Sequence, residues 1–384
     1  MKIAFDAQPL FDGTKSGVGF HEDGLVRALL KNQTDNTYFF EFFSLRNHEK
    51  KEKILSKYKR NNVCFYHCKW IPGVLYKMAS IFFPIPHRWL FPESKDITHF
   101  FNYYIPPFVK GKTVVTIHDM AFRVFPETVR KKTLLFLKSV IKKSIKRADH
   151  IVTVSEFSKQ EMMRFYHVPS EKISVVPNGV DLKRFHPEND KEVIEKVKEK
   201  YAVSGEYFLY LGTLEPRKNL VRLILAYAEA RKENADFPML VLAGGKGWMY
   251  DEIFQTVERL NLQHTVNFPG YIADEDVAAL LSGAKAFVFP SLYEGFGMPV
   301  IEAMACGVPV LTSNGSALKE IAEGAALLVD ETSIEEMKKA LLQLYQDEKL
   351  QQELVEKGMK RAKEYSWEYA GKRLITIYKS ILYE

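Results

Sequence analysis

The stretch AKAFVFPSLYEGFGMPVIEAMACGVPV, residues 284–310, decides the fold of this 384-residue chain. Its apolar run Ala286–Phe289 predicts a buried strand, which a glycine-rich turn follows. Pro299 opens the next apolar segment, and proline is tolerated in a first helical turn because its missing N–H has no partner there. Gly307 ends this predicted helix, and a second apolar strand follows. Strand, turn, helix and strand form one βαβ unit, in which the helix N-terminus is suited to bind an anion.

Two carboxylates, eight residues apart in the sequence, flank this predicted anion site. Glu294 lies in the turn, and Glu302 lies about one helical turn into the helix. Gly295 and Gly297 allow the backbone to approach a ligand closely and to adopt positive φ. Glu302 is placed to accept hydrogen bonds from two adjacent ribose hydroxyls, as carboxylates do in other nucleotide-binding folds.

The ordered string EGFGMPVIEAMACGVPV, residues 294–310, resembles the E-x7-E signature of family 4 glycosyltransferases, which have the GT-B fold. For two isolated glutamates, a turn carboxylate and a solvated helix position would be the structural alternative. The complete string favours a functional site. The resemblance implies that Glu294 holds hydroxyls of the donor sugar, together with backbone N–H groups of residues 295–298.

A second string, LGTLEPRKN at residues 211–219, follows the first predicted strand of the second half and precedes a predicted helix at 220–231. Arg and Lys at the carboxyl end of a strand are suited to bind phosphate, although a solvated basic turn would have the same composition. The string also resembles the family, in which the lysine corresponding to Lys218 binds the donor diphosphate. Many members have arginine at the position of Thr213, so here we expect Arg217 to supply the second positive charge. Such strings resemble a branch that contains many mannosyltransferases.

In the first half, His118 and Asp119 close the predicted strand 113–117. The resemblance implies that this histidine lies beside the donor sugar and phosphate, and that Asp119 orients the imidazole or bonds the sugar. The turn at residues 16–19 matches the family's glycine loop, which closes over the diphosphate and the acceptor. Gly17 is therefore a predicted donor contact.

The resemblance thus implies a complete set of site residues. The expected catalytic residues are His118, Glu294, Lys218 and Arg217. The expected donor contacts are Gly17, Gly212, Thr213, Lys218, Tyr271, Gly295, Phe296, Gly297, Met298 and Glu302, with the stretch at Tyr271 contacting the nucleobase through its backbone.

The expected chemistry uses neither a metal nor a cofactor. No D-x-D triplet lies where a divalent cation would bridge a diphosphate, so Lys218, Arg217 and a helix N-terminus would neutralise the leaving group. The family retains anomeric configuration. The resemblance therefore implies front-face displacement through an oxocarbenium-like state. The favoured donor is GDP-mannose, and a UDP-hexose is the alternative.

Strand-like and helical segments alternate through both halves of the chain, which predicts an α/β protein. We expect two Rossmann-like, doubly wound parallel-sheet domains of the GT-B type that face a cleft. The expected division is an acceptor-side domain at 1–185, a nucleotide-sugar-binding domain at 186–365, and a terminal helix at 366–384 that crosses back to the first domain. At 384 residues, two domains are also what the chain length favours.

Charge is distributed unevenly. Residues 1–190 contain 31 Lys and Arg against 19 Asp and Glu, a net charge of +12, whereas the whole chain carries +6. The basic half favours contact with an anionic surface, centred on a predicted amphipathic helix at 133–147. Further contact with the membrane interface would come from four large apolar residues, if they are not part of the core: Trp70, Phe82, Phe83 and Trp89. The alternative is a helix packed on its own domain with a solvated cationic face.

We therefore expect a cytoplasmic protein, peripheral at the inner membrane face, that acts on a glycan or lipid-linked acceptor in cell-surface polysaccharide synthesis. Three cysteines, no apolar leader and no long apolar span agree with this expectation. No nucleic-acid-binding motif accompanies the basic half, which disfavours nucleic acid as a partner. A transferase that uses a UDP-hexose and a soluble acceptor, a sugar-nucleotide epimerase of the same fold and a catalytically inactive scaffold are the rival interpretations.

Overall fold

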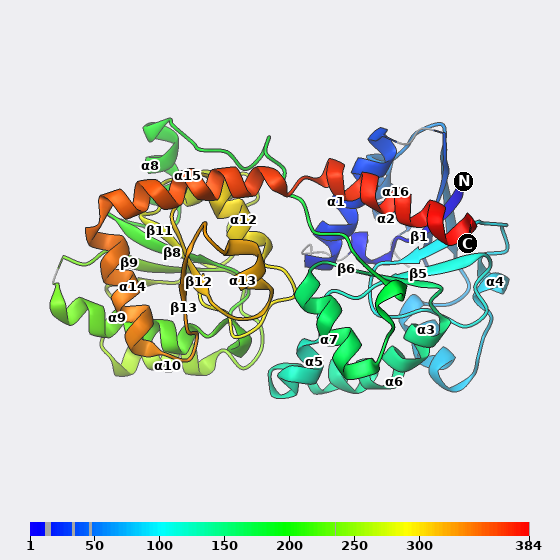
Figure 1. The fold of residues 1–384 in the computed structure, drawn as a ribbon, viewed down its shortest axis with the longest axis horizontal. Helices are drawn as coiled ribbons and strands as arrows, with labels where there is room; N and C mark the ends of the chain where they lie inside the picture. The colour runs from blue at the N-terminus through cyan, green and yellow to red at the C-terminus, as the bar shows by residue number, and fades with distance from the viewer. Residues whose placement is uncertain (12–16, 33–34, 46–47, 235, 384) are drawn as a thin grey trace. The chain divides into compact units, whose positions relative to one another are not determined.

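The structure is a computed structural model that describes residues 1–11, 17–32, 35–45, 48–234 and 236–383. The chain divides into two compact units, each built around its own sheet (Figure 1). The first unit comprises Met1–Phe122, Lys131–Gly179 and Ser366–Glu384, and the second comprises Arg123–Arg130 and Val180–Tyr365.

The division falls at Gly179, whereas the expected boundary was residue 185. The second unit resumes at Val180, whose N–H donates to the carbonyl of Tyr365 in the same unit at 3.0 Å. The short segment Arg123–Arg130 also groups with the second unit, since the indole N–H of Trp248 donates to the carbonyl of Thr128 at 2.5 Å.

The first unit contains a seven-stranded sheet in which every pairing is parallel, in the order β3-β2-β1-β4-β5-β6-β7. The order reverses between β1 and β4, and such a switch point is where ligands bind in open α/β sheets. The strands are β1 (Lys2–Asp6), β2 (Thr37–Phe43), β3 (Val63–Cys68), β4 (Ile97–Phe100), β5 (Lys112–Thr116), β6 (His150–Thr153) and β7 (Ile173–Val175).

Helices cover the faces of this sheet, so its central strands are buried and consist of nearly continuous apolar residues. The helices grouped wholly with this unit are α1 (Gly17–Asn32), α2 (His48–Ser56), α3 (Gly73–Phe82), α4 (His87–Leu90), α6 (Lys131–Arg147), α7 (Glu156–Tyr166) and α16 (Trp367–Tyr383). The terminal helix α16 packs along α1, and both lie over one side of the sheet (Figure 1). Gly24 of α1 accommodates the indole of Trp367, because a Cβ at Gly24 would lie 2.3 Å from that ring.

The second unit contains a six-stranded sheet, also parallel throughout, in the order β10-β9-β8-β11-β12-β13. Its strands are β8 (Tyr207–Leu211), β9 (Met239–Ala243), β10 (Val266–Asn267), β11 (Ala286–Phe289), β12 (Val310–Ser313) and β13 (Leu327–Val329). Its helices are α8 (Lys191–Lys200), α9 (Leu220–Glu233), α10 (Asp251–Arg259), α11 (Val277–Ser282), α12 (Met298–Ala305), α13 (Ser316–Ala322), α14 (Ile334–Gln346) and α15 (Glu348–Glu364). The switch point of this sheet lies between β8 and β11.

The predicted fold class, two doubly wound parallel-sheet units, is confirmed. The strand expected directly after Gly307 occupies Val310–Ser313, because Gly307 is in the left-handed region (φ +71°) and Pro309 has no N–H to donate to a ladder. The short strands β7 and β13, of three residues each, were not predicted. Among the described residues, no helix is long and apolar enough to cross a membrane.

Candidate active site

The switch point of the second unit brings together the two strings that the sequence singled out. Lys218 lies in a single helical turn, Pro216–Lys218, after β8, and Glu294 lies in the turn after β11. Nζ of Lys218 lies 2.5 Å from Oε1 of Glu294, and Nη1 of Arg217 lies 3.0 Å from Oε2. Each carboxylate oxygen therefore faces its own cation at the carboxyl edge of the sheet.

Arg217 is held from two further sides. Its Nη2 donates to Oε1 of Glu215 at 2.7 Å, and its Nη1 donates to the carbonyl of Tyr293 at 2.6 Å. Glu215 is only 2% exposed, and in the part of the chain that the structure describes its Oε2 makes no hydrogen bond. Two cations and two carboxylates thus form a balanced cluster, which places Arg217 beside Lys218 as the second positive charge.

The cluster determines the charge of Glu294. Burial by itself would raise the pKa of this carboxyl, but the adjacent Arg217 and Lys218 lower it to about 2. Burial lowers the pKa of Lys218, and Glu294 opposes that effect. At neutral pH the arrangement is therefore an ion pair, whose cations are already oriented toward negative charge.

Glycines bring backbone close to backbone along the same edge. Gly297, with φ +112°, precedes α12, and a Cβ there would lie 2.6 Å from Cδ2 of Leu318. A Cβ at Gly244 would lie 1.8 Å from the carbonyl oxygen of Gly212, and the N–H of Gly244 donates to Gly270 at 2.7 Å. Only glycine permits these contacts, so the turns after β8, β9 and β10 form one tightly packed edge.

Glu302 lies in α12 and is half-buried. Burial raises its pKa to about 7; Arg184 acts in the opposite direction and Asp274 adds to the increase. Arg184 in turn pairs with Asp274, with Nη2 and Oδ1 3.4 Å apart, and the hydroxyl of Tyr271 donates to the same carboxylate oxygen at 3.2 Å. The sequence predicted Glu302 and Tyr271, but it did not reveal Arg184 or Asp274 as their neighbours.

The other residues predicted to contact the donor differ in how much of their side chain is exposed to solvent. Phe296 is 5% exposed with its ring 5.6 Å from that of Tyr365, so its side chain belongs to the core and only its backbone is available to a ligand. Met298 is the first residue of α12, and Gly295 is buried. Thr213 is exposed, and its carbonyl accepts from the hydroxyl of Tyr210 at 3.0 Å.

Two residues that the sequence reasoning missed position this cluster. The hydroxyl of Ser316 accepts from the backbone N–H of Glu294 at 3.1 Å. The amide of Asn219 donates to the carbonyls of Pro290 (3.0 Å) and Glu331 (2.7 Å), and its backbone is left-handed (φ +62°). Asparagine directly after the Arg-Lys pair was the available signal, because this residue tolerates that conformation better than most.

In the first unit, His118 follows β5. Its Nε2–H donates to the carbonyl of Phe101 at 2.8 Å, and burial lowers its pKa, so the imidazole is neutral and Nδ1 carries the lone pair. Asp119 accepts from the hydroxyl of Tyr103 (2.9 Å) and the N–H of Ala121 (3.0 Å). His118 is therefore oriented by the hydrogen bond that it donates to the Phe101 carbonyl, and not by Asp119.

A second histidine supports the first. His21, in α1, is fully buried, and its ring meets that of His118 edge to face, with the centroids 4.8 Å apart. Its Nδ1 lies 2.5 Å from Oδ1 of Asn178, while its Nε2 has no hydrogen bond within the described residues. Burial and then His118 lower the pKa of His21. Gly17 begins α1, whereas residues 12–16 of the expected glycine loop lie outside the described residues.

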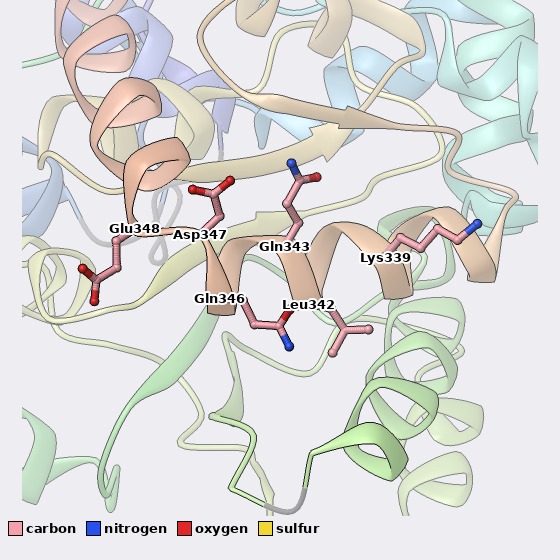
Figure 2. Close-up of a pocket in the computed structure, with 6 residues that line it drawn as sticks. All are labelled: Lys339, Leu342, Gln343, Gln346, Asp347 and Glu348. Carbon is pink, nitrogen blue, oxygen red and sulfur yellow. The ribbon is translucent and has the colours of Figure 1, made fainter.

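A hollow elsewhere on the second unit lacks these features. It lies along α14 and the start of α15, and Figure 2 shows that its side chains project in different directions and do not converge on one point. One of them, Asp347, caps α15 by accepting from the N–H of Leu350 at 2.9 Å. We therefore place the candidate site of the second unit at the carboxyl edge of its sheet.

Comparisons with known proteins identify the class. The family model described as Glycosyltransferase Family 4 matches residues 16–184, and the model described as Glycosyl transferases group 1 matches residues 191–361. O-antigen chain mannosyltransferase B from Escherichia coli is 34% identical over 308 residues, which is 80% of each chain. O-antigen chain mannosyltransferase RfbU from Salmonella typhimurium is 32% identical over 58% of each chain. The solved structure of sucrose-phosphate synthase from Thermosynechococcus elongatus superposes with a TM-score of 0.76 over 99% of both chains, at 20% identity.

Two doubly wound parallel-sheet units form the GT-B fold, which the chain shares with that solved structure. The chain belongs to family 4 of the glycosyltransferases. It is an enzyme that moves a sugar from a donor to an acceptor, and the predicted family and enzyme class are confirmed.

Proposed function

We propose that this enzyme transfers mannose from GDP-mannose to a growing surface glycan, with retention of anomeric configuration. Two relatives over much of the chain, at 34% and 32% identity, are O-antigen chain mannosyltransferases. The observation that supports the proposal at atomic level is the pairing of Lys218 and Arg217 with Glu294, since two cations suited to phosphate lie against the carboxylate to which we assign the sugar.

The donor would be divided among three parts of the second unit. Glu302 accepts from the ribose hydroxyls, the backbone near Tyr271 contacts the base, and Lys218 and Arg217 bind the diphosphate. A diphosphate competes with Glu294 for the same two cations. Donor binding would draw Lys218 toward phosphate and free Glu294 to accept from hydroxyls of the mannose.

The reaction would break the bond between mannose C1 and the phosphate oxygen and form a bond from C1 to an acceptor hydroxyl. The hydroxyl proton passes to the departing phosphate on the same face, so the products are GDP and a mannoside. Charge grows on the leaving diphosphate, and Lys218 and Arg217 stabilise it without a metal ion or a cofactor. We assign to Nδ1 of His118 a hydrogen bond from a hydroxyl of the reacting sugar.

The proposed acceptor is a glycan on a lipid carrier, and the proposed location is the cytoplasmic face of an anionic membrane. The cationic outer face of α6 supports this location, since its exposed side chains include Lys131, Lys138 and Lys142. A soluble acceptor and a UDP-hexose donor are the outcomes against which the proposal is tested.

The decisive experiment incubates the purified protein with GDP-mannose, UDP-glucose or UDP-galactose, each with and without a mannose-terminated oligosaccharide, in EDTA. Of the three donors, we expect only GDP-mannose to give a mannosylated oligosaccharide. NMR should show that the anomeric configuration is retained. Product from a UDP-hexose only would overturn the donor assignment. An isomerised sugar nucleotide without acceptor would identify an epimerase, and activity that requires added Mg²⁺ or Mn²⁺ would overturn the metal-free mechanism.

A further inference from the structure

Helix α3 exposes most of its large apolar side chains to solvent. Ser80 is 4% exposed, and its hydroxyl bonds the hydroxyl of Tyr104 and the carbonyl of Lys77. Val74 and Phe82, in contrast, are 73% and 79% exposed. A helix packed on a protein in water normally directs its apolar side chains inward, so α3 is built to face an apolar medium.

The exposed apolar residues of α3 extend into neighbouring segments. We define the apolar surface as the side chains that are more than half exposed here: Trp70, Val74, Leu75, Met78, Phe82, Phe83, Trp89 and Phe108. Backbone hydrogen bonds link two of these segments, because the N–H groups of His87 and Arg88 donate to Pro107 (2.9 Å) and Phe108 (3.3 Å). Soluble monomers rarely expose so many large apolar side chains in one region.

A core beneath holds the apolar surface in place. The ring of Tyr76, the inward side of α3, packs 5.3 Å from that of Phe43, which in turn meets Phe91. The hydroxyl of Tyr76 donates to the carbonyl of Ile85 at 3.3 Å. These contacts fix α3 and the segment after it to the sheet, so the outward side chains form a defined surface.

Cations border this surface and anions are missing from its sequence. Nζ of Lys143 in α6 donates to the carbonyl of Ile81 in α3 at 3.0 Å, which joins the two helices. Neither residues 53–92 nor residues 128–148 include an Asp or Glu. The outward lysines of α6 are Lys131, Lys132, Lys138, Lys142, Lys143 and Lys146.

Helix α6 packs on its own unit and has a solvated cationic face, which is the alternative that the sequence left open for it. Leu137, Val140 and Ile141 are buried against the first unit, so the apolar side of this helix is not available to a membrane. Helix α6 contributes charge, and the apolar contact comes from α3 and its neighbours.

We propose that the apolar surface inserts into the interfacial layer of a bilayer that contains anionic lipid, with the lysines of α6 against the headgroup phosphates. Tryptophan is enriched at that layer, and an apolar face with a cationic border is the usual composition of a surface-inserted element. A second copy of the chain fits less well, because a symmetric contact through this surface would bring two acid-free, cationic borders together. The inference rests on the proposed function only in that a lipid-linked acceptor gives the insertion its purpose.

Two native tryptophans report on the surface. Trp70 and Trp89 are 91% and 72% exposed, so we expect their emission to shift to the blue on vesicles with phosphatidylglycerol and to be quenched by brominated acyl chains. Vesicles of phosphatidylcholine alone should bind much more weakly. Raising salt from 0.1 to 1 M should weaken binding without abolishing quenching of the bound fraction, because salt screens the charges but not the apolar contact.

Matched variants separate apolar contact from charge. Met78→Ser, Phe82→Ser and Phe83→Ser together should lower the vesicle partition coefficient by more than about ten-fold. Val193→Ser with Met249→Ser, on the second unit, should leave it unchanged. Lys131→Gln, Lys138→Gln and Lys142→Gln should remove most of the salt dependence, whereas Lys232→Gln, Lys339→Gln and Lys357→Gln should not.

Each remaining outcome decides against the proposal or for it. Wild-type protein that stays in the supernatant at low salt, or an α3 variant that binds as wild type does, overturns insertion. A third outcome assigns the surface to a second copy of the chain. In that case the wild type does not bind vesicles, and light scattering shows that it is a dimer whereas the α3 variant is a monomer. The α3 variant should transfer mannose to a soluble oligosaccharide at the wild-type rate. If wild type binds vesicles but transfers no sugar at all, the insertion stands and the proposed function fails.

Discussion

Nζ of Lys218 lies 2.5 Å from Oε1 of Glu294, although 76 positions separate the two residues in the chain. They meet because β8 and β11 are neighbours in the sheet and their carboxyl ends share one edge. In the proposed donor complex the two cations bind the diphosphate and Glu294 binds the sugar, so this pair would link the two within one unit.

The first prediction tests the phosphate half of this pair. Lys218→Ala should lower kcat by about two to three orders of magnitude. A hydrogen-bond donor aimed at charge that grows in the transition state contributes roughly 3–4 kcal/mol. Affinity for GDP should fall by calorimetry, while affinity for GMP, which lacks the second phosphate, should change little. Lys285→Gln, a cation that pairs with Glu206 away from the cluster, is the control. Near-normal turnover would assign the diphosphate to Arg217 and the backbone.

The second prediction concerns Glu302. Glu302→Ala should weaken GDP binding about ten- to a hundred-fold, since a charged hydrogen-bond acceptor contributes roughly 1.5–3 kcal/mol. Because burial raises the pKa of Glu302 to about 7, the wild-type carboxylate is protonated below neutrality. GDP affinity should therefore fall as pH decreases from 8 to 6, and Glu302→Gln should remove that dependence. Equal affinity of the wild type at both pH values would contradict the ribose assignment.

The same shift in pKa predicts an effect on stability with the opposite sign. A carboxyl whose folded pKa is raised binds its proton more tightly in the folded state, so its contribution favours folding at low pH and is lost as pH rises toward 7. Glu302→Gln should therefore increase Tm at pH 8 and change it little at pH 4.5. The shift of the pKa from 4.5 to about 7 corresponds to a change in the free energy of unfolding of at most about 3 kcal/mol. Scanning calorimetry at the two pH values makes the comparison.

The third prediction addresses His118, whose Nδ1 lone pair is defined by the bond from Nε2–H to Phe101. His118→Phe keeps the ring but removes the acceptor, so kcat should fall about ten- to a hundred-fold. His118→Asn places an amide oxygen near the position of Nδ1 and should recover part of that loss. Since His21 packs on His118, thermal unfolding of both variants is the control for packing. If the two variants are equally impaired, the histidine acts through its shape and not through Nδ1.

The fourth prediction concerns Gly297, where φ is +112° and a Cβ would meet Leu318 at 2.6 Å. Gly297→Ala should destabilise the second unit by about 1–3 kcal/mol from backbone strain alone. It should also weaken GDP binding, because the start of α12 must shift. Gly245→Ala is the matched control, since no atom outside its chain neighbours lies within 4 Å of its Cβ position and its φ is not positive. Equal Tm values for the two variants would show that the turn relaxes easily.

The sequence by itself determined the class of fold and much of the candidate site. The apolar run Ala286–Phe289 has the length that the structure shows, because strands buried on both faces leave a continuous apolar signal. Lys218 and Glu294 could be named in advance because local strings, and a resemblance, marked them. Short strands such as β7 contain too few residues to show a hydrophobic periodicity, so they were not predicted.

Only the tertiary structure decided which residues meet. Several contacts depend on strand order, which no local pattern encodes: the neighbours of Glu302, the packing of His21 on His118, and the hydrogen bond that the N–H of Glu294 donates to Ser316. The same holds for the surface of the first unit. An apolar segment such as Gly73–Phe82 has the composition of a core helix, and only its packing, with Ser80 inside and Phe82 outside, shows which way it faces. Burial is a property of the assembled sheet and its helices, and it therefore emerges only when distant segments pack.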